Sequence, residues 1–462
     1  MRRHAAIDLD NQVKFLIGED GVLPKSITAC HPGSSPTKNP RMKKLAAVFL
    51  LLFVPPAFAQ IVAIRAGTVV DPAHGASARD QVILVEHGKI ISIGAAVAIP
   101  AGAEIIDLSK EWVTPGLIDA HTHMTLTEFL GDAPFESFYL NQSSTLRGLH
   151  GMHNVQAVLN QGFTTLRDVG NSAEYAMSDV RRAIEAGWFV GPTIIDAGKI
   201  IAPFGGQSHD MPPHVGPFWQ FEYIDADGPQ EVRKAVRTNI YYGARVIKLV
   251  ADNNPYHFSL EEFRAAVDEA HRAGVPVAVH VYAGDALENA IEAGVDSIEH
   301  GFDLSDAQLA RMKAKGMFLV GTDFPRAHLD IVGTSGGILP EPAVLAPKIV
   351  DRLRRAHRIG VKMAFGSDTV IDMPGRTRAD LMLDYLAVWR SADVPPIDIL
   401  RAMTVNAAEL LRVNKTRGTI GVGFSADLVA MPGDPLSDIE NLRKIDFVMK
   451  DGAVVRRPAA TR

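Results

Sequence analysis

The sequence contains a histidine pair, His121 and His123, at the end of an apolar stretch. The stretch reads Gly-Leu-Ile-Asp-Ala at 116–120, which favours a β-strand. Residues two apart on a strand project to the same face, so both imidazoles can bind one ion. A lone histidine is most often an ordinary core or surface residue, but a His-X-His pair directly after such a strand predicts a metal site.

A lysine lies inside a second apolar stretch, where Lys248 has valine and isoleucine before it and leucine and valine after it. Burying an unpaired ammonium group is costly. Lys248 could be a Schiff-base nucleophile, a carbamate formed with carbon dioxide that bridges two metal ions, or an ion-paired structural lysine. Alone it favours the structural state, but beside several metal-ligand side chains we interpret it as the carbamate.

Three further polar residues end apolar stretches in the same way. His280 ends Val-Ala-Val-His, His300 ends Ser-Ile-Glu-His, and Asp368 ends Phe-Gly-Ser-Asp. Imidazoles at two neighbouring strand ends can complete the ligands of a second ion, and a carboxylate can accept a proton. Gly-Ser-Asp is usually a turn, but in this order we interpret Asp368 as both a metal ligand and a catalytic residue.

The elements that would position these residues are eight apolar stretches that alternate with helical ones. This alternation predicts βα units around a parallel sheet, with a helix over 259–273 because Ser259 precedes Glu262 by three residues, as in a capping box. Eight units match a (β/α)8 barrel, whose catalytic groups gather at the C-terminal strand ends, and a doubly wound open sheet is the alternative. The expected strands are 116–123, 164–169, 193–201, 246–250, 277–282, 297–300, 317–322 and 362–368.

The two ends of the chain are rich in short β-type stretches separated by glycine-containing turns. Residues 60–113 and 413–462 therefore predict one small β-sandwich domain formed by both chain ends. Residues 114–412 remain for the barrel. The expected fold class is α/β, a TIM-type barrel with this accessory domain.

Residues 42–59 have the three parts of a secretory signal peptide. Basic residues at 41–44 precede an apolar run, which ends near Ala-Phe-Ala at 57–59. That run of about ten residues is too short for a membrane span, which needs roughly 20. We therefore expect a periplasmic or secreted protein with no membrane span in its mature form, with Met42 as the native start and residues 1–41 as a non-native extension.

Composition limits the remaining possibilities. The 462 residues include one cysteine, Cys30, which excludes an intramolecular disulfide and a cysteine-ligated metal cluster. The formal net charge of -6 offers no general attraction to nucleic acid or to an anionic membrane. We therefore expect a small-molecule or dipeptide substrate and a metal held by histidine and carboxylate.

The metal-ligand residues described above, in this order, resemble the binuclear-metal pattern of the amidohydrolase superfamily. The resemblance extends over about 62–455. It implies a (β/α)8 barrel beside a β-sandwich and two divalent ions, commonly zinc. It also implies that a carboxylated Lys248 bridges the ions, that a metal-bridging hydroxide is the nucleophile, and that the chain could form a homo-oligomer.

The same resemblance implies a role for each of the other ligands. His121 and His123 would hold the buried ion, whereas His280 and His300 would hold the exposed one. Asp368 would bind metal and act as the general base.

Within the superfamily, the chain resembles a branch of imidazolonepropionase-like and Xaa-Pro dipeptidase-like enzymes, and also ochratoxin-type amidases. The segments that carry this resemblance are 162–168, 280–282 and 423–428. The branch implies that Tyr282 contacts the substrate, although a tyrosine that packs on the barrel rim is the competing interpretation. A Gly-Gly-His common in the branch is replaced here by Gly-Gly-Gln-Ser-His, which makes His209 a second candidate for substrate binding.

The predicted function is hydrolysis of a peptide-like amide bond, in Xaa-Pro-type dipeptides or N-acyl amino acids, ochratoxin-like amides included. One alternative is a cyclic amidohydrolase that opens an imidazolone-like ring at the same site. Another is a lyase that forms a Schiff base at Lys248, which borohydride would inactivate in the presence of substrate and chelators would not affect.

Overall fold

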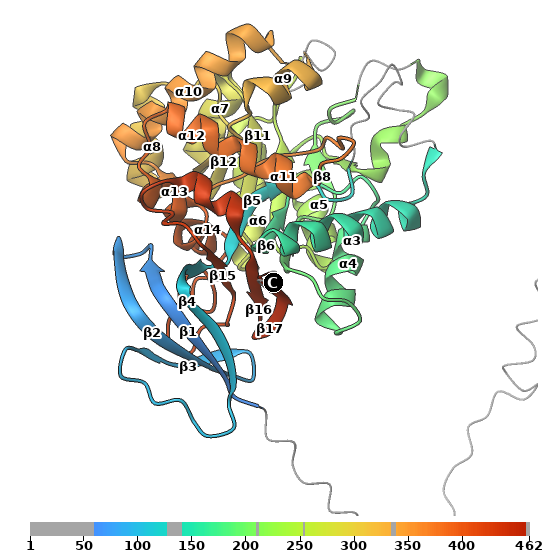
Figure 1. The fold of residues 1–462 in the computed structure, drawn as a ribbon. Coiled ribbons are helices and arrows are strands. Elements are labelled where there is room, and N and C mark those ends of the chain that lie inside the picture. The colour runs from blue at the N-terminus through green and yellow to red at the C-terminus, as the bar shows by residue number, and fades with distance from the viewer. Residues whose placement is uncertain (1–59, 127–140, 209–211, 253–254, 334–338, 459–462) are drawn as a thin grey trace, which may run out of the picture. The chain divides into compact units, whose positions relative to one another are not determined.

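The computed structural model describes residues 60–126, 141–208, 212–252, 255–333 and 339–458. Its central part is a barrel of eight parallel strands surrounded by helices (Figure 1). Each barrel strand lies within one or two residues of its expected start. The strands are β5 (Leu117–Thr122), β6 (Phe163–Asp168), β7 (Thr193–Asp196), β10 (Ile247–Val250), β11 (Val277–Val281), β12 (Ser297–His300), β13 (Phe318–Val320) and β14 (Lys362–Met363).

Backbone hydrogen bonds close the strands into a ring. The Ala120 N–H donates to the Phe365 carbonyl at 2.7 Å, which joins the eighth strand segment to β5. On the other side, the Arg245 N–H donates to the Asp196 carbonyl at 2.8 Å, which joins the segment before β10 to β7. The (β/α)8 fold class is therefore confirmed, and the doubly wound open sheet is wrong.

The third and eighth expected strands differ most from the sequence prediction. The third is interrupted at Gly198, whose φ of 66° is incompatible with an extended chain, and continues as β8 (Ile200–Ala202), which pairs with β9 (Tyr223–Asp225). The eighth is regular only in β14. Beyond it, the Asp368 N–H donates to the His121 carbonyl at 2.8 Å, so the strand end bonds to β5 rather than extending its pairing with β13.

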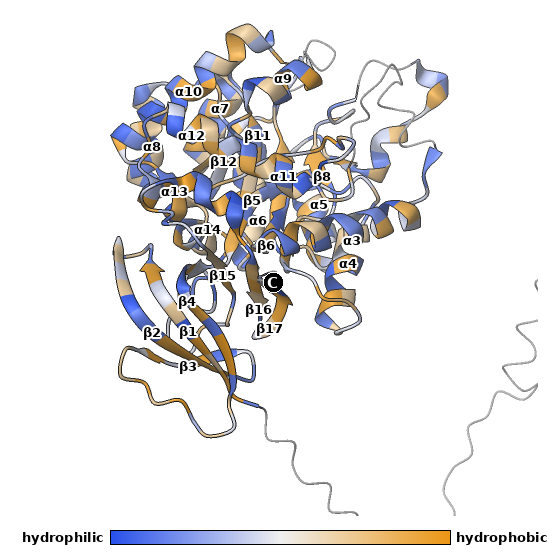
Figure 2. Ribbon diagram, viewed as in Figure 1, coloured by the Kyte–Doolittle hydropathy of each residue, from blue (hydrophilic) through white to orange (hydrophobic). Residues whose placement is uncertain are grey.

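Helices form the layer outside the strands. The expected helix at 259–273 is α6 (Leu260–Arg272), and its capping box is confirmed because the Ser259 side chain accepts from the Glu262 N–H at 3.3 Å. The helices carry hydrophilic and hydrophobic residues side by side (Figure 2). The others are α3 (Ser144–Asn160), α4 (Ala176–Glu185), α5 (Pro229–Tyr242), α7 (Gly284–Ala293), α8 (Asp306–Lys315), α9 (Arg326–Val332), α10 (Pro342–Ile359), α11 (Arg378–Met382), α12 (Leu386–Ser391), α13 (Pro396–Ala402) and α14 (Val405–Leu410).

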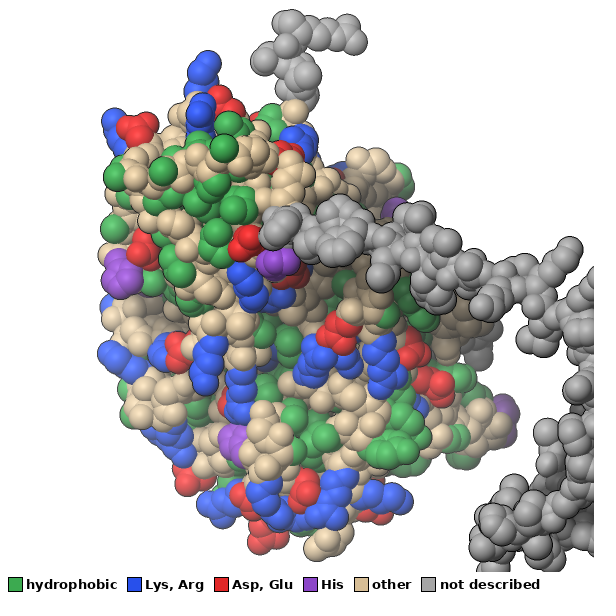
Figure 3. Space-filling view, turned by 90° about the horizontal axis from the view of Figure 1, so that it is seen from below, with side chains coloured by type: hydrophobic (Ala, Val, Ile, Leu, Met, Phe, Trp, Pro, Cys, Tyr) green, Lys and Arg blue, Asp and Glu red, His purple; other side chains and the backbone are tan. Residues whose placement is uncertain are grey.

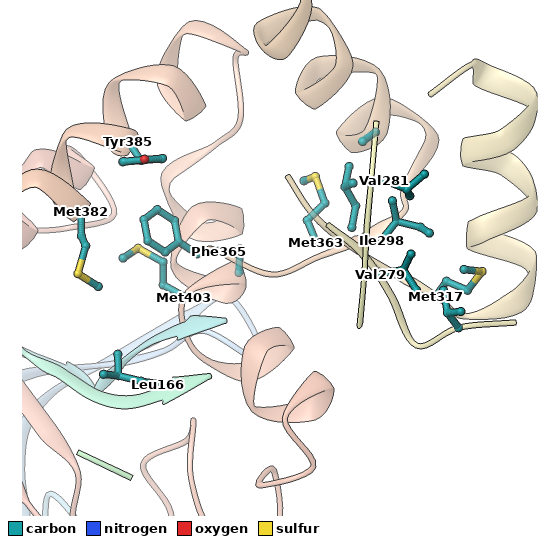
Figure 4. Packing of buried hydrophobic residues seen from close by; sticks show 14 of the residues in the cluster. Leu166, Val279, Val281, Ile298, Met317, Met363, Phe365, Met382, Tyr385 and Met403 are labelled. Carbon is teal, nitrogen blue, oxygen red and sulfur yellow. The ribbon is translucent and has the colours of Figure 1, made fainter. Parts of the chain in front are cut away.

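The apolar core has one part between strands and helices and another inside the barrel. Val279 and Val281 of β11 belong to the first part, shown in Figure 4, together with Ile298 of β12. Ala278, the neighbour of Val279 in β11, belongs to the second part. This alternation sends every second strand residue into the barrel, and it places the following inward position of β11, His280, at the strand end.

Both chain ends build the accessory domain. The order of its seven-stranded sheet is β17-β16-β15-β4-β1-β2-β3, and β15 pairs antiparallel with β4. A bridge between Lys89 and Ser425 joins β3 to the segment before β15. The expected small β domain formed by both chain ends is therefore confirmed. Its strands are β1 (Val62–Asp71), β2 (Ala76–Glu86), β3 (Lys89–Gly94), β4 (Glu104–Pro115), β15 (Leu428–Met431), β16 (Phe447–Lys450) and β17 (Ala453–Arg456).

Several sequence predictions fall outside the described residues. These are the extension at 1–41, the signal peptide at 42–59 and His209.

Within the described ranges, no helix combines the length and apolar character needed to cross a membrane. On the face shown in Figure 3, acidic and basic side chains are interspersed. Exposed ion pairs, for example Arg182 with Asp179, each contribute little to stability.

Candidate metal centre

The imidazoles of His121 and His123 meet the carboxylate of Asp368 at the C-terminal ends of the first and last barrel strands. The two Nε2 atoms are 3.3 Å apart. Asp368 Oδ1 lies 3.6 Å from Nε2 of His121 and 3.3 Å from Nε2 of His123. Burial would raise the pKa of Asp368, but the two imidazoles outweigh burial and lower it, which favours the carboxylate. Three such ligand atoms within 4.8 Å of one another can hold a cation.

Hydrogen bonds at the opposite ring nitrogens turn both imidazoles toward this point. Nδ1 of His121 is 2.6 Å from Glu299 Oε2, and Nδ1 of His123 is 3.2 Å from the Gly170 carbonyl oxygen. Both acceptors require a proton on Nδ1. In a neutral ring, each Nε2 then carries a lone pair, which is the form in which histidine binds a metal.

Lys248 reaches into the same interior from β10. Its side chain is 2% exposed, and its Nζ has no hydrogen-bond partner among the described residues. Burial lowers the pKa of Lys248 to about 8. A structural lysine would be expected to have a close acceptor, so the ion-paired alternative loses its main support.

His280 and His300 stand beside this group. Their ring centroids are 4.4 Å apart, and that of His300 is 5.2 Å from the centroid of His121. Neither belongs to the group of ligand atoms within 4.8 Å of one another. The structure therefore places His280 and His300 near that group but not as close together as its members are. Burial holds the pKa of both imidazoles well below the usual range, which favours the neutral rings. Nε2 of His300 is buried and has no hydrogen-bond partner among the described residues.

Two of these predicted ligands have strained backbones. The φ angles of His300 and Asp368 are 67° and 52°, in the left-handed region that non-glycine residues rarely adopt. At His300 this conformation breaks the strand alternation, so that adjacent residues, Glu299 and His300, both face His121. Strain of this kind persists where the surroundings enforce it, and it is typical of functional sites.

The sequence interpretation missed four charged residues around the histidines, of which Asp119, Arg167 and Glu299 are buried and Asp252 is partly exposed. Asp119 accepts from the N–H groups of His121 and Ser367, and burial raises the pKa of Asp119 to about 7. Asp252 Oδ1 lies 3.7 Å from His280 Nε2. The other two are Arg167 and Glu299. Charged residues within apolar strands were the signal that singled out Lys248, and the same signal was present at Asp119, Arg167 and Glu299.

Tyr282 follows β11 and lies over the histidines. Its ring centroid is 4.5 Å from that of His280 and 5.3 Å from that of His300. Its ring also stacks on Phe302 at 5.0 Å with an interplanar angle of 10°. The tyrosine is therefore close enough to contact a substrate above the histidines, while its Phe302 contact also fits packing on the rim.

A glycine supports the ring of His123. A Cβ at Gly170 would lie 2.7 Å from His123 Cε1 and 2.8 Å from Nδ1. Because both contacts are too short, Gly170→Ala is expected to turn the His123 ring and weaken zinc binding by about tenfold, by analogy with other changes to the support of metal ligands. A competition titration of metal-free protein with a chromophoric chelator measures this.

Gly148→Ala is the matched control. A Cβ there would meet only the Ala176 Cβ at 3.5 Å, an ordinary contact, and alanine favours α3. We expect unchanged zinc affinity and equal or slightly higher stability for Gly148→Ala. Unchanged affinity in Gly170→Ala would show that the His123 ring is not held in place by this close approach.

Known proteins are similar to this chain over most of its length. Ochratoxinase from Aspergillus niger is 29% identical over 441 residues, covering 87% of this chain and 88% of the relative. Imidazolonepropionase from Cupriavidus taiwanensis is 26% identical, covering 77% of this chain and 85% of the relative. The crystal structure of a Xaa-Pro dipeptidase with bound methionine in the active site has a TM-score of 0.75 and 29% identity, and the match covers 86% of this chain and 100% of that chain. Residues 112–455 match the amidohydrolase family, to which this chain therefore belongs as a hydrolase.

Proposed function

We propose that this chain is a metal-dependent hydrolase that cleaves a peptide-like amide bond, with Xaa-Pro-type dipeptides and N-acyl amino acids as its substrate class. The observation that carries the proposal is the convergence of His121, His123 and Asp368 beside a buried Lys248 whose Nζ has no hydrogen-bond partner among the described residues. Similarity to a Xaa-Pro dipeptidase and to an ochratoxinase supports the choice of substrate class.

The side chains fit a pair of divalent ions, which members of this family generally bind. The available donors are imidazole nitrogens and carboxylate oxygens, which suit zinc. The buried Nζ of Lys248 and Nε2 of His300 have no partner among the described residues, as expected of atoms that face a bound group. When bound, the ions would activate a water molecule and polarise the substrate carbonyl. The residues proposed to hold them are His121, His123, Lys248, His280, His300 and Asp368.

Lys248 is proposed to act as a carbamate. The low pKa that burial gives this lysine keeps a substantial share of its amine uncharged near neutral pH. The uncharged amine can add to carbon dioxide with loss of one proton, which yields an anion with two oxygen atoms. Such a group would remove the cost of an unpaired buried ammonium and could place one oxygen on each ion.

Asp368 is proposed to handle the proton. Its carboxylate takes a proton from the attacking water and delivers it to the departing nitrogen. Its position 3.3 Å from His123 Nε2 and its partly exposed side chain support this role. Tyr282, over His280 and His300, is proposed to contact the substrate near its carbonyl or terminal carboxylate.

A cyclic amide is the second candidate substrate, favoured by the similarity to imidazolonepropionase over 77% of this chain. The same proton transfer at Asp368 would open a ring. A Schiff base at Lys248 uses the same uncharged amine. Schiff-base chemistry needs no metal ion, so this alternative does not explain why the Nε2 atoms of His121 and His123 lie close together.

We also propose that residues 42–59 direct export of the chain and that Met42 is the native start. The basic, apolar and small-residue parts of this segment support that proposal. Mass spectrometry of the natural protein would give glutamine 60 at the new N-terminus if the segment is removed, whereas a chain that begins at Met1 would contradict the proposed start.

Removal of the metal tests the proposed function. We expect about two zinc-like ions per chain by elemental analysis, as in other two-metal sites. We also expect release of free amino acids from a mixed library of dipeptides and N-acyl amino acids, with loss of this activity after chelation and recovery on adding zinc.

The library also separates the candidates. A chain that hydrolyses imidazolone-like rings and none of the linear amides would replace the first substrate class by the second. Turnover that resists chelation, in a protein that holds no metal, would contradict the metal-dependent proposal. Inactivation by borohydride with substrate would then favour the lyase.

A further inference from the structure

Two buried charged side chains, Glu299 of β12 and Arg167 of β6, meet inside the barrel next to His121. Both are at most 1% exposed. Arg167 Nη2 donates to Oε1 and Oε2 of Glu299 at 2.7 and 2.9 Å. Glu299 Oε2 in turn accepts from Nδ1 of His121 at 2.6 Å. The three side chains therefore form one continuous hydrogen-bonded chain from three different strands.

The surroundings hold this chain of contacts in one arrangement. Arg167 Nη1 donates to Ser297 Oγ at 3.0 Å, and its Nε donates to the Ala120 carbonyl oxygen, one residue before His121. The Ser297 hydroxyl also donates to Glu299. These N–H groups of Arg167 donate to acceptors on β5 and β12. Arg167 therefore links the strand that carries His121 to the strand that carries Glu299.

A buried ion pair adds little net stability to a folded protein. Moving both charges out of water is costly, and a well-packed apolar pair of similar volume would fill a barrel interior at least as well. Apolar residues such as Ile118, Ala278 and Phe318 fill another part of the barrel interior. The charged pair occurs at the point where Glu299 can reach the ring of His121, which indicates that its purpose concerns that ring.

We propose that Glu299, held by Arg167, is a positioning residue that fixes the proton of His121 on Nδ1 and directs its Nε2 toward the bound ion. This inference rests on the proposed metal-dependent function. A carboxylate behind a metal-bound histidine orients the ring and makes it a stronger ligand. The segment 162–168, which carried only a family resemblance in the sequence, thereby gains a physical role through Arg167.

A double replacement separates positioning from stability. Glu299→Leu leaves the Arg167 guanidinium buried without its partner, so we expect a lower Tm and weaker zinc binding. The double variant Arg167→Met with Glu299→Leu removes both charges, so we expect its Tm to recover toward that of the parent. Its zinc affinity, measured by chelator competition on metal-free protein, should stay about 10- to 100-fold weaker, as for lost supports of other metal ligands.

Asp427→Asn is the matched control. Asp427 pairs with the buried Lys450 at 3.2 Å in the accessory domain, so its loss should lower the Tm and leave zinc affinity unchanged. A double variant that regains its Tm and binds zinc like the parent would overturn the positioning role. A parent protein that binds no zinc would instead refute the proposed function, so the two failures are distinguishable.

A measurement on the unaltered chain decides the matter even if the double variant does not fold. In metal-free protein with ¹⁵N-labelled histidine, where no ion fixes the tautomer, the His121 signals, assigned by their loss in His121→Asn, should show a proton on Nδ1. A His121 ring with its proton on Nε2 would overturn the proposal.

Discussion

Replacing Asp368 with asparagine is expected to lower kcat by about 10³-fold, within the ~10²–10⁴-fold range typical of general acid–base catalysis, and to change KM little. Asparagine has the same shape but cannot accept a proton. The backbone contact of Asp368 with the His121 carbonyl at 2.8 Å does not involve the side chain and should persist. Steady-state kinetics on the best linear amide of the library measures both constants, with zinc content determined on the same sample.

The control is Asp179→Asn. Asp179 lies in α4 and forms an exposed ion pair with Arg182 at 3.0 Å. Its replacement should leave kcat, KM and zinc content unchanged. If Asp368→Asn kept its zinc and at least a third of the parent kcat, Asp368 would not be the proton acceptor. A loss of zinc together with activity would place its main effect on metal binding.

The fold was predictable because its signals are local. Apolar stretches bounded by turns marked the strands, and the Ser259 and Glu262 capping box marked the start of α6. What local signals could not provide was the pairing at strand ends. Gly198 interrupts the third strand, and Asp368 bonds to His121 instead of extending the regular part of β14. Both features depend on contacts between distant segments.

The candidate ligands were recognisable because Lys248 is a charged residue inside an apolar strand and the others are polar residues at or near strand ends. The structure places all of them in one region, with His121, His123 and Asp368 closest together. The chain of contacts from Arg167 through Glu299 to His121 was not predictable, because Arg167 and Glu299 are separated by 132 residues in sequence. The left-handed backbone of His300 was also hidden, since any strand pattern assigns alternate faces to residues 299 and 300.

Lys248→Ala is expected to abolish most turnover, by about 10³-fold or more, because loss of a bridging ligand would remove ~4 kcal/mol or more of the charge stabilisation that metal ions give a transition state. The stability of the metal-free protein should change little. The substitution loses apolar contacts of the lysine stem, but it also removes a buried amine that has no hydrogen-bond partner among the described residues. Kinetics, zinc content and Tm are measured on one preparation. Lys362→Ala, at an exposed lysine paired with Glu409, is the control and should match the parent in all three.

Chemical rescue of Lys248→Ala distinguishes the possible states of the lysine. The shortened side chain leaves space in the buried interior near His280 and His300. Both imidazoles are close enough to Lys248 for its charge to lower their pKa values. If Lys248 acts as a carbamate, a small carboxylate such as propionate can supply the two missing oxygen atoms, so we expect partial recovery of zinc content and turnover. If the free amine is the nucleophile, a small primary amine should restore turnover and propionate should not. Recovery with the amine alone would therefore reject the carbamate and transfer the chemistry to Lys248 itself.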